Sequence, residues 1–334
     1  PPMKPLAMQS ESLQLSADTP VIRPSDARAW AECVRRVWLD NAGTVELPDE
    51  EDAFVQLVID RGIEHEQSVL ARLGADADIV EALSEAHTQE LMDAGVDVIY
   101  QAQLSDPRLG LVGRPDFLIR TDSGEYQPAD AKLAASVDKK EIQVQIGVYR
   151  RLLGNGLPGL VFLGNGEQVE LGEEVEEITD QFLQDMRSLL EAETEPAVRY
   201  AHSRCQACPY IDHCLPRFEA DDDLSLLYGV QGRAADGLQA AGIDSIAMLS
   251  EAEPSTVPDV PYLKGDKKAR AILQAKSLRT GKVHQIAPLS LPSGTWVHFD
   301  LEDNPLTATG DKHVYLWGFL EPGYGKGNFL GIWT

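Results

Sequence analysis

Three charged side chains near the middle of the chain have the types and the spacing needed for chemistry on a phosphodiester. Asp116 lies in the apolar segment LVGRPDFLIR, and Asp130 and Lys132 lie two positions apart in PADAKLA. Because side chains alternate between the two faces of a strand, Asp130 and Lys132 are expected on one face. Carboxylates from neighbouring strands can hold Mg²⁺ with its water molecules, and an ammonium group can orient such a water or stabilise charge on a phosphate. The alternative is structural, with both aspartates at strand ends and the lysine in a surface ion pair.

Two further pairs of polar side chains are candidates for the same site. Gln145 and Tyr149 are four residues apart, so on a helix they share one face and would present an amide and a hydroxyl to a phosphate backbone. His65 and Glu66 lie in the segment RGIEHEQSVL, where an imidazole or a carboxylate would supply another metal ligand. For each pair taken alone, packing or an ordinary surface position is the alternative.

Helices flank the segments that carry these residues. Ser25 is expected to cap a helix that runs through Trp38 and contains Cys33. Apolar residues at helical spacing predict two more helices, over 51–73 and 139–153. The candidate side chains beyond the strands therefore lie on the second and third of these helices.

Three extended stretches lie between the second and third helices. They cover 96–104, 110–120 and 125–133, and the turn-forming segments SDPRLG and TDSG separate them. This pattern predicts a strand meander with the aspartates on its second and third strands. The apolar LVFLG predicts a further short strand.

The overall charge is strongly acidic, which by itself argues against a nucleic-acid partner. The chain has 334 residues, with 29 Lys and Arg against 54 Asp and Glu, a net charge of −25. The charge is unevenly spread, however, because eleven acidic residues fall within 167–195, whereas lysine and arginine predominate within 132–151. No apolar run approaches the roughly 20 residues of a membrane span, and the first residues lack the order of a signal peptide. We therefore expect a cytoplasmic protein that does not enter the membrane.

In chain order, the motifs G-x-x-H-E, G-R-P-D, D-x-K and Q-x-x-x-Y resemble those of the PD-(D/E)XK nucleases of the RecB family, over residues 21–218. The resemblance implies an α/β fold with a restriction-endonuclease-like core, in which helices flank a mixed sheet. It also implies Mg or Mn as cofactor and cleavage of DNA.

The resemblance assigns roles to the candidate residues. Asp116 and Asp130 would bind the metal, and Lys132 would assist the attacking water. Gln145 and Tyr149 would position DNA. His65 is the expected third metal ligand, with Glu66 as the competing candidate because the first motif varies there. Many relatives carry Glu at the position of Asp130, which the motif allows.

The four cysteines form a separate set. Cys205, Cys208 and Cys214 have the spacing C-x2-C-x5-C, and Cys33 lies far upstream. Four thiolates suit an iron-sulfur cluster or a structural zinc, and disulfides are disfavoured in a cytosolic chain. The arrangement resembles the iron-sulfur staple of the CRISPR-associated RecB-like exonuclease and of the AddB nuclease domain. This implies a structural 4Fe-4S cluster, with zinc as the alternative.

The segment after Arg217 changes character. Its glycine turns, Gly229-Val-Gln-Gly232 and the later YLKG, resemble helix-hairpin-helix units, whose backbone N–H groups face phosphates, although the first turn has one residue more than usual. A helical linker domain is the alternative. The final stretch resembles the first strands of an RNase H-like exonuclease domain, with Asp300 and Glu302 in D-x-E. We expect a strand pair there and no second active site, because a two-metal site needs further carboxylates.

These features predict four regions and one main function. The regions are a flexible lead-in (1–22), a nuclease domain with an iron-sulfur cluster (23–220), a helix-hairpin-helix-like domain (221–285) and an incomplete RNase H-like β segment (286–334). The predicted function is a metal-dependent DNA nuclease, an exonuclease on single-stranded or frayed ends, in DNA repair, recombination or defence. The chain is expected to be a fragment or shorter form of a larger DNA-processing protein. The alternative is a non-catalytic DNA-binding module that acts with a helicase.

Overall fold

The structure is a computed structural model, and it describes residues 21–47, 53–288, 297–304, 313–320 and 329–333. The predicted lead-in therefore lies outside the described residues except at its end, where Ile22 is buried and pairs with Leu111. No helix in the described ranges has the length and apolar character needed to cross a membrane. The chain divides into two compact units, one of Pro1–Ala31, Glu50–Ala192 and Trp296–Thr334, the other of Glu32–Asp49 and Glu193–Thr295.

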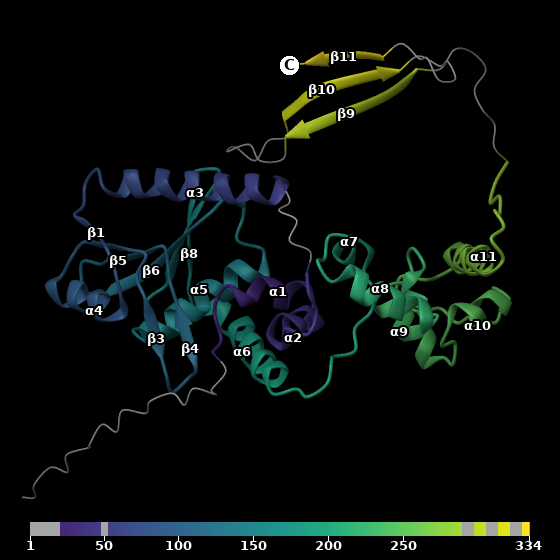
Figure 1. Ribbon diagram of the computed structural model, residues 1–334, viewed down its shortest axis with the longest axis horizontal. Helices are drawn as coiled ribbons and strands as arrows, with labels where there is room; N and C mark the ends of the chain where they lie inside the picture. Colours follow the sequence, from purple (N-terminus) through teal and green to yellow (C-terminus); the bar gives the residue numbers. More distant parts are fainter. Residues whose placement is uncertain (1–20, 48–52, 289–296, 305–312, 321–328, 334) are drawn as a thin grey trace, which may run out of the picture. The chain divides into compact units, whose positions relative to one another are not determined.

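A mixed six-stranded sheet forms the centre of the first unit (Figure 1). The strand order is β1-β2-β5-β6-β7-β8, in which β1 and β2 are parallel, β6 and β7 are parallel, and the other neighbours are antiparallel. The strands are β1 (Ile79–Glu81), β2 (Val98–Tyr100), β5 (Phe117–Arg120), β6 (Tyr126–Lys132), β7 (Gly159–Leu163) and β8 (Gln168–Leu171). This mixed α/β arrangement is consistent with a restriction-endonuclease-like core.

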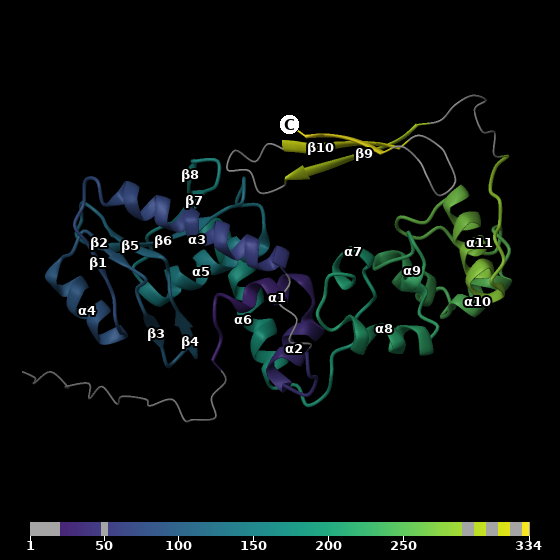
Figure 2. The same cartoon turned by 45° about the horizontal axis from the view of Figure 1, so that its top comes forward.

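Helix α3 (Ala53–Leu73) covers one face of the sheet (Figure 2). Its buried Val69 packs in a cluster with Phe117 of β5 and Phe162 of β7. Alternation along β7 places Phe162 toward α3 and its neighbour Val161 toward the opposite face. The predicted helix over 51–73 is therefore present, and it packs through its C-terminal half.

Three helices lie on the opposite side of the sheet. They are α4 (Glu85–Ala94), α5 (Lys140–Leu153) and α6 (Glu176–Leu190), of which α6 packs against α5. Ile146 of α5 packs with Val161, and Leu91 of α4 packs with Leu118. Helix α5 ends before Gly154, as the sequence predicted.

The predicted meander is wrong in one respect, because two of its three stretches are each broken in the middle. The stretch 96–104 breaks at Gln101, whose positive φ of 54° turns the chain away from the sheet. The stretch 110–120 breaks at Pro115, which has no N–H to contribute to a strand ladder. The fragments that leave the sheet pair with each other as an antiparallel ribbon of β3 (Leu104–Asp106) and β4 (Leu111–Gly113).

The first predicted helix is also divided. Cys33 lies between α1 (Asp26–Glu32) and α2 (Val34–Ala42), not inside one helix. Its backbone is extended, with φ −167° and ψ 120°, and its carbonyl accepts the hydrogen bond from Val37 that begins α2. Neither glycine nor proline marks this break, and the helical spacing of the apolar residues continues across it. The sequence therefore predicted a single helix.

The second unit is helical. After α2 it contains α7 (His202–Cys205), α8 (Ile211–Ala220), α9 (Arg233–Ala240), α10 (Ile246–Glu251) and α11 (Asp266–Thr280). Buried side chains between Leu224 and Ala275 form one hydrophobic core. Residues 193–220 and α2 belong to this unit, so its extent differs from that of the region 221–285 predicted from the sequence.

The last described strands form an antiparallel sheet of their own. Its order is β11-β10-β9, where β9 is His298–Asn304, β10 is His313–Leu320 and β11 is Phe329–Trp333. The expected strand pair is thus extended by a third strand.

Candidate active site

Asp116 and Asp130 lie together because β5 and β6 are adjacent antiparallel strands. Phe117 pairs with Ala129, which brings the preceding Asp116 beside Asp130 and Ala131. The Asp116 carboxylate accepts a hydrogen bond from the backbone N–H of Ala131 at 2.8 Å, and the Asp116 N–H points at the Asp130 carboxylate at 3.4 Å. Lys132 forms an ion pair with Asp130, as their shared strand face predicted.

The position of Asp116 differs from the prediction. It lies at a bend directly before β5, not within a strand. The preceding Pro115 removes a ladder donor and fixes its own φ, so the chain turns there before it enters the sheet. The bend allows the Asp116 side chain to reach the backbone of β6.

Burial and mutual repulsion keep a proton on the carboxylate pair. Burial, followed by the charge of Asp130, raises the pKa of Asp116 from 3.8 to about 9. Burial acts against the charge of Lys132, but Asp130, Asp116 and Glu66 outweigh it and raise the pKa of Lys132 above its usual value. Lys132 therefore remains positively charged, whereas Asp116 is protonated at neutral pH when no metal ion is bound.

The residues fit a hard divalent cation. Asp130 is 2 % exposed, and its Oδ2 atom, which faces the Lys132 ammonium, accepts no hydrogen bond of regular geometry from the described residues. A cation would satisfy that oxygen and oppose both the burial and the Asp130 charge that raise the pKa of Asp116. Within the described ranges no three His, Cys, Asp or Glu side chains already surround one ion position.

Glu66 and His65 face different surroundings although they are neighbours on α3. Glu66 acts electrostatically on Lys132 and accepts hydrogen bonds from Tyr100 at 2.7 Å and Gln101 at 2.5 Å. His65 hydrogen-bonds through Nε2 to the carbonyl of Phe162 at 2.9 Å. The charge of Glu66 thus reaches Lys132, whereas the His65 ring is bonded to the backbone of β7, and the metal-ligand role of either residue stays a prediction.

Tyr100 and Gln101 are site residues that the sequence analysis missed. Both fix the Glu66 carboxylate, and the Gln101 N–H also donates to the carbonyl of Asp116 at 2.8 Å. Gln101 adopts a left-handed backbone that a residue with a side chain rarely accepts, and such strain is concentrated at functional sites. No sequence signal marks it, since this conformation is usually signalled by glycine.

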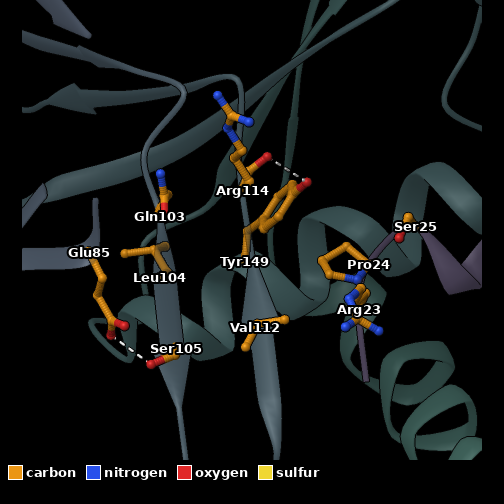
Figure 3. A pocket seen from close by; sticks show the side chains of 11 residues that line it. Arg23, Pro24, Ser25, Glu85, Gln103, Leu104, Ser105, Val112, Arg114 and Tyr149 are labelled. Atoms are coloured by element: carbon orange, nitrogen blue, oxygen red, sulfur yellow. Dashed lines mark hydrogen bonds between the residues drawn. The ribbon is translucent and has the colours of Figure 1, made fainter. Parts of the chain in front are cut away.

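Tyr149 and Gln145 lie on α5, but the partner of the Tyr149 hydroxyl in the structure is a backbone carbonyl, where a DNA phosphate was expected. The Tyr149 ring is buried, and its hydroxyl donates to the carbonyl of Arg114 at 3.2 Å (Figure 3). Burial and then the charges of Asp130 and Asp116 raise its pKa well above 10. Tyr149 therefore borders the carboxylate pair and anchors the chain before Asp116. Gln145 is half-buried on the same helix.

The four cysteines meet in the second unit. Cys33 precedes α2, Cys205 ends α7, Cys208 follows it and Cys214 lies in α8. All four are free thiols of intermediate exposure. Burial raises the pKa of each of the last three, and the charge of Cys33 adds to each shift, so the four thiols lie within electrostatic range of one another. In the described ranges they do not already surround one ion position. Four sulfur donors fit an iron-sulfur cluster or zinc.

An ion-pair network surrounds the last cysteine. Glu195 pairs with Arg35 at 2.9 Å, with Arg217 at 2.5 Å and with His213 at 3.3 Å. Burial acts against the Glu195 charge, but these partners outweigh it and lower the pKa of Glu195. Arg35 also hydrogen-bonds to Cys214, so the network connects α2 and α8 beside the thiols.

The two glycine turns of the second unit have the same backbone conformation. Gly232 has φ 53° and ψ −122° at the start of α9, and Gly265 has φ 56° and ψ −131° at the start of α11. A positive φ of this kind requires glycine, and each turn leads directly into a helix. The pair is thus a structural repeat.

Comparison with known proteins gives a family. The model of the PD-(D/E)XK nuclease superfamily matches residues 12–215. No curated protein matches the chain. The solved structure described as "Crystal structure of SSO0001" is similar, with 14% sequence identity and a TM-score of 0.31 over 60% of this chain and 88% of that chain.

The family match spans Asp116, Asp130 and Lys132 and the six-stranded sheet around them. The chain belongs to the PD-(D/E)XK nuclease superfamily, whose members generally use divalent metal ions. Membership indicates a nuclease, which would act on DNA.

Proposed function

We propose that the chain is a metal-dependent deoxyribonuclease of the RecB type, an exonuclease on single-stranded or frayed DNA ends. The observation that carries the proposal is the buried Asp130, with Asp116 and Lys132 beside it. Such an enzyme would serve DNA repair, recombination or defence, within a larger DNA-processing complex or with a helicase.

The side chains divide the chemistry between them. Asp116 and Asp130, with Glu66, would hold Mg²⁺ or Mn²⁺, which supplies positive charge and an activated water when it is bound. The three carboxylates keep Lys132 charged, so its ammonium can donate a hydrogen bond to the attacking water or to a phosphate oxygen. Hydrogen bonds from the backbone N–H groups of Ala131, to the carboxylate, and of Gln101, to the carbonyl, fix Asp116 before substrate arrives.

End-labelled single-stranded and double-stranded DNA, incubated with Mg²⁺ or Mn²⁺, tests the proposal. Asp116→Ala and Lys132→Ala should each abolish cleavage while folding and DNA binding persist, and a chelator should stop the wild type. Asp122→Ala is the matched control, because Asp122 is exposed in the turn between β5 and β6.

Two outcomes would contradict the proposal in different ways. Full cleavage by Asp116→Ala would place the active site elsewhere. DNA binding by the wild type without cleavage under any metal would favour the alternative, a non-catalytic module that works with a helicase.

We propose further that the four cysteines hold a 4Fe-4S cluster whose role is structural. The electrostatic range between Cys33 and the trio within 205–214 supports this, because segments about 170 residues apart in the chain supply one donor set. Zinc is the alternative, and metal analysis of the purified protein distinguishes them.

We propose that the turns at Gly232 and Gly265 act as helix-hairpin-helix contacts to DNA phosphates. Their matching conformation supports this role. Exposed Lys264 and Lys267 flank the second turn. Replacing both lysines by glutamate should weaken duplex binding in fluorescence anisotropy, and unchanged binding would favour a helical linker.

A further inference from the structure

A cavity beside the carboxylate pair takes no part in the hydrolysis described above (Figure 3). Its volume is about 450 Å³, and it is lined by Arg23–Ser25, by the β3–β4 ribbon and by Tyr149 of α5. The Tyr149 hydroxyl donates to the carbonyl of Arg114, another lining residue, which precedes Asp116 by two positions. Two lining residues, Tyr149 and Arg114, therefore link the cavity to the proposed catalytic carboxylates, whose charges act on Tyr149.

Two arginines give this cavity a positive character. Arg23 and Arg114 are both exposed, and neither forms an ion pair with a carboxylate in the described part of the chain. Figure 3 shows their guanidinium groups on different sides of the Tyr149 ring. The acidic member of the lining, Glu85, accepts a hydrogen bond from Ser105 at 2.6 Å. Unpaired guanidinium groups with planar donors are suited to phosphate oxygens.

The space between the arginines is mostly apolar. Pro24, Leu104 and Val112 form its walls, and the amide of Gln103 adds a polar edge. Apolar walls with a few polar groups and a volume of roughly 300–1,000 Å³ are typical of sites for small organic ligands. One nucleotide has this size and combines a charged phosphate with apolar surface on its sugar and base. A base-paired nucleotide is too large for the cavity, because its partner strand comes with it.

We infer that this cavity binds one unpaired nucleotide of the substrate strand, next to the phosphodiester that is cut. Arg114 contacts the phosphate nearer to Asp116, Arg23 contacts the next phosphate, and the apolar walls hold the sugar and base. This assignment rests on the proposed function and deepens it, because the cavity would select single-stranded or frayed ends. A free mononucleotide has the same phosphate, sugar and base, and the experiment below distinguishes it from a nucleotide within a strand.

Fluorescence anisotropy of a labelled oligo-dT strand, in the cleavage-deficient Lys132→Ala protein, tests the assignment. Adding Arg23→Ala should weaken binding about tenfold and lower the slope of log affinity against log salt by roughly 0.7, the value for one phosphate contact on a single strand. Arg108→Ala is the matched control, because Arg108 is an exposed arginine of the same ribbon that pairs with Asp106. A blunt hairpin duplex should bind more weakly than oligo-dT and should not respond to Arg23→Ala.

The outcomes separate this inference from the proposed function. Equal losses from Arg23→Ala and Arg108→Ala, or no loss from Arg23→Ala, would overturn the nucleotide site. A further outcome is that thymidine monophosphate displaces the labelled strand at the same concentration as unlabelled oligo-dT does. That result would show a free-nucleotide site and overturn the strand assignment. In the otherwise unmodified enzyme, Arg23→Ala should raise KM about tenfold with kcat within about twofold. A wild type that cleaves nothing contradicts the proposed hydrolysis and leaves the binding comparison intact.

Discussion

At the scale of single residues, the protonation of Asp116 couples metal binding to pH. Burial and the charge of Asp130 raise its pKa from 3.8 to about 9, so the folded protein without metal carries a proton there that the unfolded chain has lost. A metal ion must displace this proton, because the ligand is the ionised carboxylate. The same shift has a consequence for stability and a consequence for metal affinity.

The affinity for Mn²⁺ should rise with pH between about pH 6 and pH 8, because each binding event releases the Asp116 proton. Without metal, the folded state binds more protons than the unfolded state from pH 3.8 to about 9, so stability should fall as the pH rises through that window. Calorimetric titration and urea unfolding measure the two effects. In Asp116→Asn this contribution should disappear from both, and an unchanged dependence would show that another group is responsible.

A second prediction at this scale separates Glu66 from His65. Glu66→Gln should weaken Mn²⁺ binding by about tenfold or more, because it removes a carboxylate that faces Lys132, whereas His65→Gln should change it less than about threefold. The measurement is calorimetric titration of both variants at one pH. A larger loss in His65→Gln would restore the imidazole as the third ligand.

At the scale of elements, the contact between α5 and α6 depends on the absence of a side chain. A Cβ atom on Gly147 would lie 1.9 Å from Oγ1 of Thr179, a fully buried residue whose hydroxyl is already bonded to the carbonyl of Val175. A Cβ atom on Gly62 of α3 would meet no atom within 4 Å. The two helical glycines are therefore a matched pair with opposite expectations.

Gly147→Ala should destabilise the protein by about 1–3 kcal/mol, because the helices must separate or Thr179 must give up its rotamer. Gly62→Ala should stabilise it by up to about 1 kcal/mol, the helix preference of alanine over glycine. Urea midpoints at constant m-value measure both. Stabilisation by Gly147→Ala would show that α6 does not pack on α5 in this way.

The sequence predicted the elements with clear periodicity and missed their interruptions. The helices over 51–73 and 139–153 and the shared face of Asp130 and Lys132 follow from local spacing. The break at Cys33 and the left-handed Gln101 were missed, since tertiary contacts and not glycine or proline determine them. The same reason hid the partnership of Gln101 with Glu66.

At the scale of the whole molecule, the cysteines connect parts of the chain that sequence position separates. Protein purified without oxygen should be brown and contain about four iron atoms per chain if the proposed cluster is present. Cys208→Ser should lose the colour and aggregate more readily, because α2 would lose the cluster's link to residues 193–220 and keep only polar contacts such as the Arg35–Glu195 ion pair. Iron analysis, absorption spectra and light scattering measure these effects, and a colourless protein with one zinc would support the alternative.

The last prediction concerns the sheet β9–β11, where Asp300 and Glu302 resemble the opening pair of a second metal site. Both side chains are exposed and share one face of β9, since they pair with Gly318 and Leu316 of β10. Asp303 points to the other face, and Asp311 and Glu321 lie outside the described residues. Two exposed carboxylates alone do not hold the two metal ions of such a site.

The double variant Asp300→Ala with Glu302→Ala should therefore keep nuclease activity within about twofold, roughly 0.4 kcal/mol in the activation barrier. Its physical basis is the contrast with Asp130, whose buried carboxylate lies beside Asp116 and Lys132, whereas the β9 pair is open to solvent. The measurement is kcat/KM on end-labelled single-stranded DNA, with circular dichroism to verify the fold. Loss of activity in a folded double variant would mean that the D-x-E pair is catalytic and that the site at β5 and β6 is not sufficient for cleavage.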